Sequence, residues 1–181
     1  MYQLVVQRNK MSTIYEILIS ESPENPMESV EEAEAIAGRG IKGDRYYEKR
    51  GTFSPEPHKA DFELTIIEKE KVEEFARNSG LPFTVRDARR NLVTEGIELN
   101  ELVGKQFYIG ESKLTAIRLC EPCNYLAKTS YPETLKGLAH KGGLRVQILE
   151  SGKIQVGDTI RVIEENEAEQ GACHNADKSA S

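Results

Sequence analysis

Short runs of alternating apolar and polar residues recur along most of the 181-residue chain, and this pattern predicts β-strands. The runs are rich in Val, Ile, Leu and Tyr, and segments containing Gly, Pro or Asn separate them. We expect about nine or ten strands, among them Tyr2–Arg8, Thr13–Ser20, Val30–Ile36, Phe62–Ile67, Gln106–Ile109, Lys113–Leu119, Leu144–Leu149 and Thr159–Ile163. Gly110–Ser112 would close a hairpin, and Ser151–Lys153 and Val156–Asp158 would form turns.

Helical spacing is confined to a few short segments. Residues 68–78 carry apolar side chains at Val72 and Phe75, and Gly80 follows as a stop signal. A second helix is predicted over Tyr131–Ala139. Because strands dominate and do not alternate with helices, we predict a mostly-β protein, a closed β-barrel with a few short helices.

The chain is long enough for one domain with a substantial core, which we place at residues 1–163. Residues 164–181 are polar, acidic and rich in alanine, a composition typical of a disordered tail. Residues 50–59 contain Gly51, two prolines and His58, and predict an irregular connection that could act as a flap. A lone histidine in such a segment is more often solvated than catalytic.

Composition excludes several classes of protein. No window approaches the roughly 18 continuous apolar residues that a membrane helix needs, and the N-terminus lacks the pattern of a signal peptide. Three cysteines, an odd number gathered in the C-terminal third, do not form a disulfide framework. These features favour a soluble protein of the reducing cytoplasm.

The net charge of −6 is unevenly distributed. Residues 21–34 hold six acids and no base, and residues 163–181 hold five acids and one base, which leaves a net charge of +4 on the rest of the chain. A locally positive face suits a small anionic ligand. The basic residues are too few and too bunched for the broad footprint that nucleic-acid binding needs.

The most informative stretch is Cys120-Glu121-Pro122-Cys123, which follows the predicted strand 113–119. Pro122 favours the start of a helix that Asn124 to Lys128 can continue, which would put Cys123 in its first turn. The positive end of a helix favours a thiolate, which can act as a nucleophile, a sulfur carrier or a soft-metal ligand. The alternative is a pair of small buried residues at a strand-to-helix junction.

Two basic clusters are candidate anion sites. The first is the glycine-rich segment 38–47, which carries Arg39, Lys42 and Arg45 and could hold a phosphate or a carboxylate, or could be a turn with exposed bases. The second is Arg86–Asn91, where three arginines and an asparagine lie within six residues. The guanidinium fork matches phosphate, and an amide can pair with the edge of a heterocycle.

The ordered set of motifs resembles a stand-alone MOSC domain, the module found at the C-terminus of molybdenum cofactor sulfurases. The resemblance runs from about residue 15 to residue 163 and rests on six segments with a closing stretch. These are Gly40–Tyr46, Leu64–Ile67, Ala88–Thr94, Gly104–Phe107, Cys120–Cys123 and Gly143–Val146, closed by Gly152–Asp158.

The resemblance implies a barrel of the pyruvate-kinase type and a site for the molybdenum cofactor, molybdopterin. It places the metal ligand or sulfur-carrying thiol on Cys123 rather than Cys120. It implies that Arg89 and Asn91 hold the pterin end and that Arg45 lies near the phosphate. Neighbours expected around that site are Lys42, Asp44, Arg118 and Arg145. Two positions depart from the family pattern, Tyr46-Tyr47 after Gly-Asp-Arg and Arg90 beside Arg89. We interpret Tyr46, Tyr47 and His140 as structural residues.

Three functions remain open at this stage. The first is a molybdenum-dependent reductase of N-hydroxylated compounds that draws electrons from a separate donor protein, since no flavin, haem or iron–sulfur motif is visible. The second is a carrier that takes persulfide sulfur on Cys123 from a cysteine desulfurase. The third is a non-catalytic metal module, in which Cys120 and Cys123 would join Cys173 and His174 around zinc.

Overall fold

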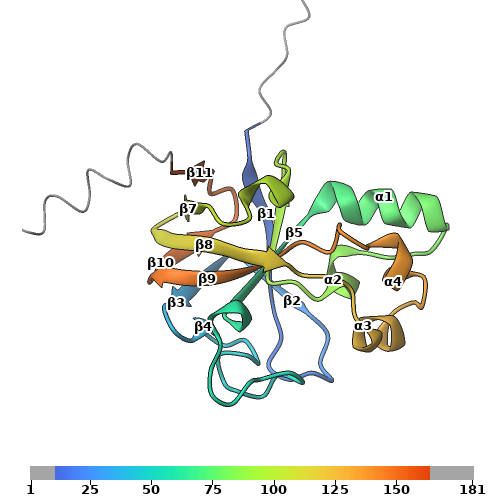
Figure 1. The fold of residues 1–181 in the computed structure, drawn as a ribbon, viewed down its shortest axis with the longest axis horizontal. Coiled ribbons are helices and arrows are strands. Elements are labelled where there is room, and N and C mark those ends of the chain that lie inside the picture. The colour runs from blue at the N-terminus through green and yellow to red at the C-terminus, as the bar shows by residue number, and fades with distance from the viewer. Residues whose placement is uncertain (1–10, 164–181) are drawn as a thin grey trace, which may run out of the picture.

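The computed structural model describes residues 11–163, and within them the protein is mostly β with a few short helices. The larger sheet has eight strands in the order β11-β7-β8-β9-β5-β6-β1-β2, and a smaller sheet has the order β10-β3-β4. The helices gather at one end of the larger sheet (Figure 1). The strands are β1 Thr13–Ile19, β2 Glu28–Val30, β3 Glu32–Ile36, β4 Gly40–Ile41, β5 Leu64–Glu68, β6 Leu92–Glu95, β7 Gln106–Ile109, β8 Ser112–Leu119, β9 Leu144–Glu150, β10 Gly152–Gln155 and β11 Ile160–Val162.

Four short α-helices and two 3₁₀ turns complete the described residues. They are α1 Lys69–Ser79, α2 Val85–Ala88, α3 Asn124–Thr129 and α4 Thr134–Gly137, with 3₁₀ turns at Ala60–Phe62 and Leu99–Leu102. The predicted stop at Gly80 is confirmed, since this residue ends α1 in the left-handed conformation. The helix expected over 131–139 is only the single turn of α4, because Pro132 and the glycines around it support no longer segment. No helix among residues 11–163 is long and apolar enough to cross a membrane.

Three central strands carry consecutive apolar pairs because both of their faces are buried. Ile17, Ile66 and Leu92 belong to the cluster inside the curved sheet. The next residue on each strand belongs to a second cluster between the sheet and the helices; these residues are Leu18, Ile67 and Val93. Successive side chains of a strand point to opposite faces, so such strands read as continuous apolar runs rather than as alternating ones.

The predicted closed barrel is not what the structure shows, because no sheet among the described residues closes on itself. β11 pairs with β7 alone, and it approaches the start of β1 only through an isolated bridge between Thr13 and Thr159. Two backbone hydrogen bonds support that bridge, from the Ile14 N–H to the Asp158 carbonyl at 2.9 Å and from the Ile160 N–H to the Ser12 carbonyl at 3.0 Å. β11 spans three residues, which is too short to extend this contact into a ladder.

Two further expectations differ from the structure. Residues 152–155 form β10 instead of a turn, paired with β3. One strand–helix–strand unit is present, since β5 and β6 pair in parallel across α1 and α2. A parallel pair needs such a crossover, and this one brings the Arg86–Asn91 segment back to the start of β5. The strand predicted at 2–8 and the acidic tail at 164–181 lie outside the described residues.

Candidate functional site

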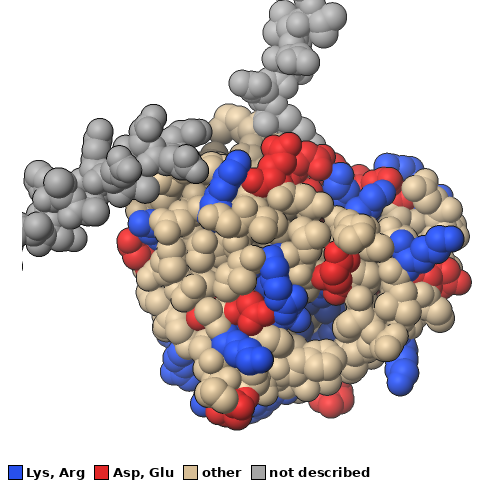
Figure 2. Space-filling view, viewed as in Figure 1, with Lys and Arg blue, Asp and Glu red and all other residues tan. Residues whose placement is uncertain are grey.

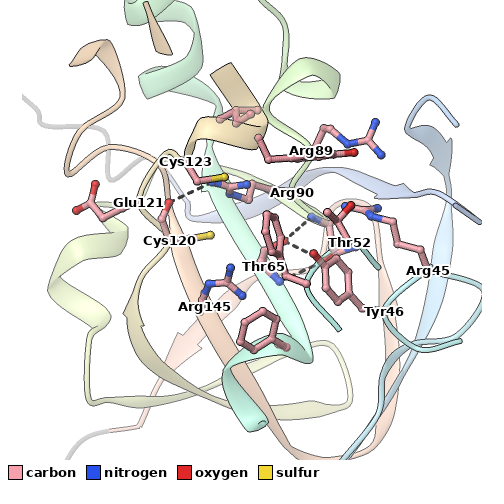
Figure 3. A pocket seen from close by; sticks show the side chains of 15 residues that line it. Arg45, Tyr46, Thr52, Thr65, Arg89, Arg90, Cys120, Glu121, Cys123 and Arg145 are labelled. Atoms are coloured by element: carbon pink, nitrogen blue, oxygen red, sulfur yellow. Dashed lines mark hydrogen bonds between the residues drawn. The ribbon is translucent and has the colours of Figure 1, made fainter. Parts of the chain in front are cut away.

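A cavity of about 280 Å³ opens where the sheet meets the helices and the connection that follows β4. Figure 2 shows basic groups around and inside a recess on this face, beside a few acidic groups. The cavity brings together segments that are far apart in the sequence (Figure 3). Its lining residues are Arg45, Tyr46, Thr52, Phe53, Phe62, Thr65, Arg89, Arg90, Asn91, Cys120, Glu121, Cys123, Tyr125, Leu126 and Arg145.

Both described cysteines line this cavity, and neither is in a disulfide. Cys120 is buried and Cys123 is exposed, and Figure 3 shows both sulfur atoms facing the interior while the Glu121 carboxylate points away. Cys123 is the N-cap of α3, one position before the first turn where the sequence placed it, because the helix begins at Asn124. The exposed thiol at position 123 is therefore the one that a ligand in the cavity can reach.

A glycine pair holds the cysteine segment in place. The Cys120 N–H donates to the Gly143 carbonyl at 2.7 Å. A Cβ at Gly142 would overlap the carbonyl oxygen of Cys120, and a Cβ at Gly143 would overlap that of Ile66. Only residues without a side chain allow this close backbone approach.

Arg90 is the main support of that segment, although the sequence marked it only as a departure from the family pattern. Its guanidinium donates to three backbone carbonyls, those of Gly142 at 3.0 Å, Cys120 at 3.1 Å and Ala88 at 3.1 Å. The side chain thus connects the end of α2 to two segments, the one that carries Cys120 and the one that carries Gly142. No sequence signal points to this role, since every residue carries a carbonyl.

Arg89 lies in the cavity wall, and its conformation aims it there. It follows α2 in the left-handed conformation, with φ of 55°, and its guanidinium donates to the carbonyls of Asn25 and Pro23, both at 3.0 Å. Burial, and then the nearby charge of Arg45, lower the pKa of Arg89. A guanidinium that is desolvated beside a second one gains most from an anion placed between them.

Asn91 also lines the cavity, but its amide is largely used within the fold. Its Oδ1 accepts from the Thr65 hydroxyl at 3.0 Å and the Thr65 N–H at 3.3 Å, and its Nδ2 donates to the Leu18 carbonyl at 3.4 Å. The side chain therefore fixes β5 against β1 and β6. What it offers a ligand is its remaining amide hydrogen.

Only one residue of the Lys42–Arg45 segment reaches the cavity. Arg45 is buried and donates to Asp44 at 3.1 Å, and burial raises the pKa of its neighbour Tyr46. Asp44 is a structural carboxylate, which also accepts from the backbone N–H groups of Ser20 and Tyr46. Lys42 is exposed and pairs with Glu34 at 3.0 Å, outside the residues that line the cavity.

The opposite wall is formed by β9 and the turn before β5. Arg145 lies 4.2 Å from the ring centroid of Phe62 and donates to the Asp61 carbonyl at 3.1 Å. Arg118 is exposed and forms an ion pair with Asp61, and it does not line the cavity. Tyr47 and His140 are also absent from the lining; Tyr47 stacks with Arg39, and His140 binds Glu121 at 2.9 Å.

Four arginines thus surround the cavity, whereas Glu121 is the one carboxylate in its lining, and it is held by His140. Three of the guanidiniums are held by neutral backbone carbonyls, so their charge is not cancelled. Aromatic rings of Tyr46, Phe53, Phe62 and Tyr125 complete the walls. The arrangement suits a ligand with an anionic group, a planar ring and an atom that binds sulfur.

Residues 11–163 contain no cluster of three or more His, Cys, Asp or Glu side chains placed to hold a metal ion. Cys173 and His174, which the zinc hypothesis needs, lie outside the described residues. Cys120 and Cys123 are the two thiols in the lining of this cavity, so a metal held by them would need further donors from a ligand.

Comparisons with known proteins give a consistent family and fold. The family model described as MOSC domain matches residues 48–161. The YuaD protein of Bacillus subtilis superimposes with a TM-score of 0.71 at 18% identity, over 84% of this chain and 95% of that one. YiiM of Geobacillus stearothermophilus does so with a TM-score of 0.66 at 16% identity, over 84% and 75%. YiiM of Escherichia coli gives 0.60 at 16% identity, over 85% and 69%. No protein with a curated description matches the sequence.

Proposed function

Because the chain belongs to the MOSC domain family, we propose that it binds a molybdenum cofactor in the arginine-lined cavity and reduces N-hydroxylated compounds there. The observation that carries this proposal is the meeting of an exposed thiol, Cys123, with four guanidiniums and four aromatic rings in one cavity. The family is linked to proteins of the molybdenum cofactor, and the donor set of the cavity fits such a group.

Each part of the cofactor has a matching wall. Cys123 supplies a soft sulfur ligand for a thiophilic metal. Arg89, whose partners are neutral carbonyls, would bind the phosphate through charge-assisted hydrogen bonds, and Arg45 would add positive charge that Asp44 partly offsets. Tyr46 and Phe62 would give a planar pterin apolar contact; their ring centroids lie 6.2 Å apart, and Arg45 and Arg145 lie over the two rings. When bound, the cofactor supplies two-electron chemistry at the metal.

The overall reaction breaks an N–O bond: a hydroxylamine, two protons and two electrons give the amine and water. The chain's own residues bind and orient the reactants, and the carbonyl contacts of Arg90 keep Cys123 at the cavity wall. The electrons come from a separate donor protein. The protons come from water at the open cavity mouth. A reducing cytoplasm, which the sequence predicts, would keep both thiols available.

The test is elemental analysis combined with pterin fluorescence on protein produced in a host that makes the cofactor. We expect molybdenum and pterin to co-purify in equal amounts with the wild-type chain. Cys123→Ser should lose most of the reductase activity, whereas the matched control Cys120→Ser should retain it. Wild-type protein without molybdenum would contradict the proposal.

A second function uses the same thiol without a metal. Cys123 is exposed whereas Cys120 is buried, so a partner protein can reach Cys123 to deliver sulfur. Cys123 would then carry a persulfide received from a cysteine desulfurase. Incubation with a desulfurase and cysteine, followed by mass spectrometry of the Cys123 peptide, distinguishes the two functions, since a pure reductase would gain no persulfide.

A further inference from the structure

A second hollow lies on the other side of Cys123. It has a volume of about 440 Å³ and is lined by Thr52, Phe53, Cys123, Asn124, Tyr125 and Lys128. Four of these residues, Thr52, Phe53, Cys123 and Tyr125, also line the arginine cavity. The Cys123 thiol therefore stands at a boundary that two separate hollows share.

The two hollows differ in chemistry. The arginine cavity is lined by four guanidiniums, whereas Lys128 is the only charged residue of the second hollow. The second surface is largely apolar and dominated by the rings of Phe53 and Tyr125. These rings meet edge to face, with centroids 5.7 Å apart and an interplanar angle of 86°. Phe53 is 44% exposed although it is a large apolar side chain, and it lines this hollow.

The segment that carries Phe53 is held by packing. A Cβ at Gly51 would come within 2.6 Å of the Tyr46 ring, so the backbone there lies directly against that ring. The Ser54 N–H donates to the Gly51 carbonyl at 3.0 Å and closes a turn around Thr52 and Phe53. On the other side, the Tyr125 hydroxyl donates to the Pro23 carbonyl at 3.3 Å. Both rings are therefore set in place by contacts outside the hollow.

We propose that this second hollow is a binding subsite for the molecule that reacts at Cys123, and that it takes a flat, uncharged aromatic ring. An exposed aromatic edge gains from a third ring that packs against it. Asn124, next to the thiol, offers an amide that can pair with heteroatoms of such a ring. An anionic group would be drawn instead to the arginine side. The proposal rests on the proposed function, in which Cys123 holds the metal or the sulfur at which that molecule reacts.

The test measures how fast Cys123 reacts with two pairs of matched reagents, in full-length protein without cofactor. N-phenylmaleimide and N-methylmaleimide differ by a ring, and iodoacetate and iodoacetamide differ by a charge. Adducts on the Cys123 peptide are quantified by mass spectrometry. We expect the phenyl-to-methyl rate ratio to exceed that of glutathione, and Phe53→Ala to lower it about threefold or more.

Three further variants make the result specific. Phe53→Leu keeps apolar bulk without the ring and should lower the same ratio. Lys42→Ala removes a surface charge outside both hollows and should leave the ratio unchanged. Arg89→Ala should lower the iodoacetate-to-iodoacetamide ratio and leave the phenyl-to-methyl ratio alone. A phenyl-to-methyl ratio that does not respond to either change at Phe53, or both ratios falling together in Phe53→Ala, would overturn the subsite.

This measurement separates the subsite from the cofactor proposal. If the wild-type protein lacks molybdenum yet shows the ring preference, the cofactor proposal is wrong and the subsite proposal stands. If wild type and Phe53→Ala contain equal amounts of molybdenum and the ring preference is the same in both, the cofactor proposal stands and the subsite proposal is wrong.

Discussion

The two ends of β5 lie beside groups of opposite charge, arginines at its start and a buried glutamate at its end, and these groups differ in their hydrogen-bond partners. At its start, Thr65 faces the cavity that Arg45, Arg89, Arg90 and Arg145 line. At its end, Glu68 lines a hollow with Glu70, Lys71 and Glu98 on the far side of the crossover. At the first end, Arg89, Arg90 and Arg145 have backbone carbonyls as partners, and Arg45 pairs with Asp44. At the second end, Glu68 Oε1 accepts from the Leu99 N–H at 2.9 Å, but Oε2 is buried without a hydrogen-bond partner.

The first end of β5 is suited to bind an anion, whereas the second end lowers the stability of the fold. Carbonyls hold a guanidinium in position without cancelling its charge, so the positive end remains ready for an anion. A buried carboxylate with one oxygen that lacks a hydrogen-bond partner lowers the stability of the fold. We therefore expect changes at the arginine end to weaken the protein or its ligand binding, and a change at the Glu68 end to strengthen the fold.

The largest expected effect is that of Arg90→Ala. Three carbonyls would lose a charged donor, and the free energy of unfolding should fall by about 3 kcal/mol. Urea unfolding measures the change. The matched control is Arg118→Ala, since Arg118 is exposed and its ion pair with Asp61 lies on the surface, and we expect it to cost less than about 1 kcal/mol. Equal losses in both variants would mean that the carbonyl contacts add nothing.

A smaller effect is expected for Arg89→Ala, and it concerns binding. The variant should retain about tenfold less molybdenum after dialysis, because a charged hydrogen-bond donor to the phosphate is lost. Arg89→Lys keeps the charge without the fork and should lie between the two. Lys42→Ala is the control, since Lys42 pairs with Glu34 away from the cavity. If Lys42→Ala loses as much molybdenum as Arg89→Ala, the assignment of Arg89 fails.

The smallest effect is expected for Glu68→Gln, with the opposite sign. Burial raises the pKa of Glu68 above its ordinary value of 4.5, so the folded state holds its proton more tightly than the unfolded chain. The free energy of unfolding of the wild type therefore falls as pH rises from about 4.5 through the raised pKa. Glu68→Gln lacks this penalty and should be more stable at neutral pH, by about 1 kcal/mol.

Unfolding curves of the two proteins across pH check this expectation. The advantage of Glu68→Gln should shrink as pH falls and vanish below pH 4.5, where Glu68 is protonated in both states. A constant difference across the whole range would show that ionisation of Glu68 is not its cause.

Local features were the ones that the sequence predicted well. The strand before Cys120, the short helix after Cys123 and the hairpin at residues 110–111 all follow from alternation, proline and glycine signals, and the structure confirms them. The same logic failed at Gly152, where a glycine was taken as a turn. It lies inside β10, and a Cβ there would come within 2.6 Å of the Glu111 backbone, so the missing side chain serves packing.

Features that depend on distant partners could not be read from the chain. Barrel closure depends on how β1 meets β11, which are separated by most of the sequence. Lys42 and Arg45 are three residues apart, yet only Arg45 turns into the cavity. Arg90 escaped notice because its partners are carbonyls, which carry no sequence signature. The lining by Phe53 was also missed, since an irregular connection gives no period from which its direction could be predicted. Tyr125 was missed because α3 is too short to show a clear periodicity.

The connection between β1 and β2, whose Pro23 and Asn25 carbonyls hold Arg89, links the two sides of the site. The carbonyl of Pro23 accepts from both Arg89 and the Tyr125 hydroxyl, so residues 21–27 are fastened to the charged wall and to the aromatic one. Anything that tightens either wall should slow the opening of this loop. Amide hydrogen exchange of residues 21–27 would then report whether the cavity is occupied. Substitutions in that loop would in turn change the reactivity of the Cys123 thiol, one hundred positions after Pro23.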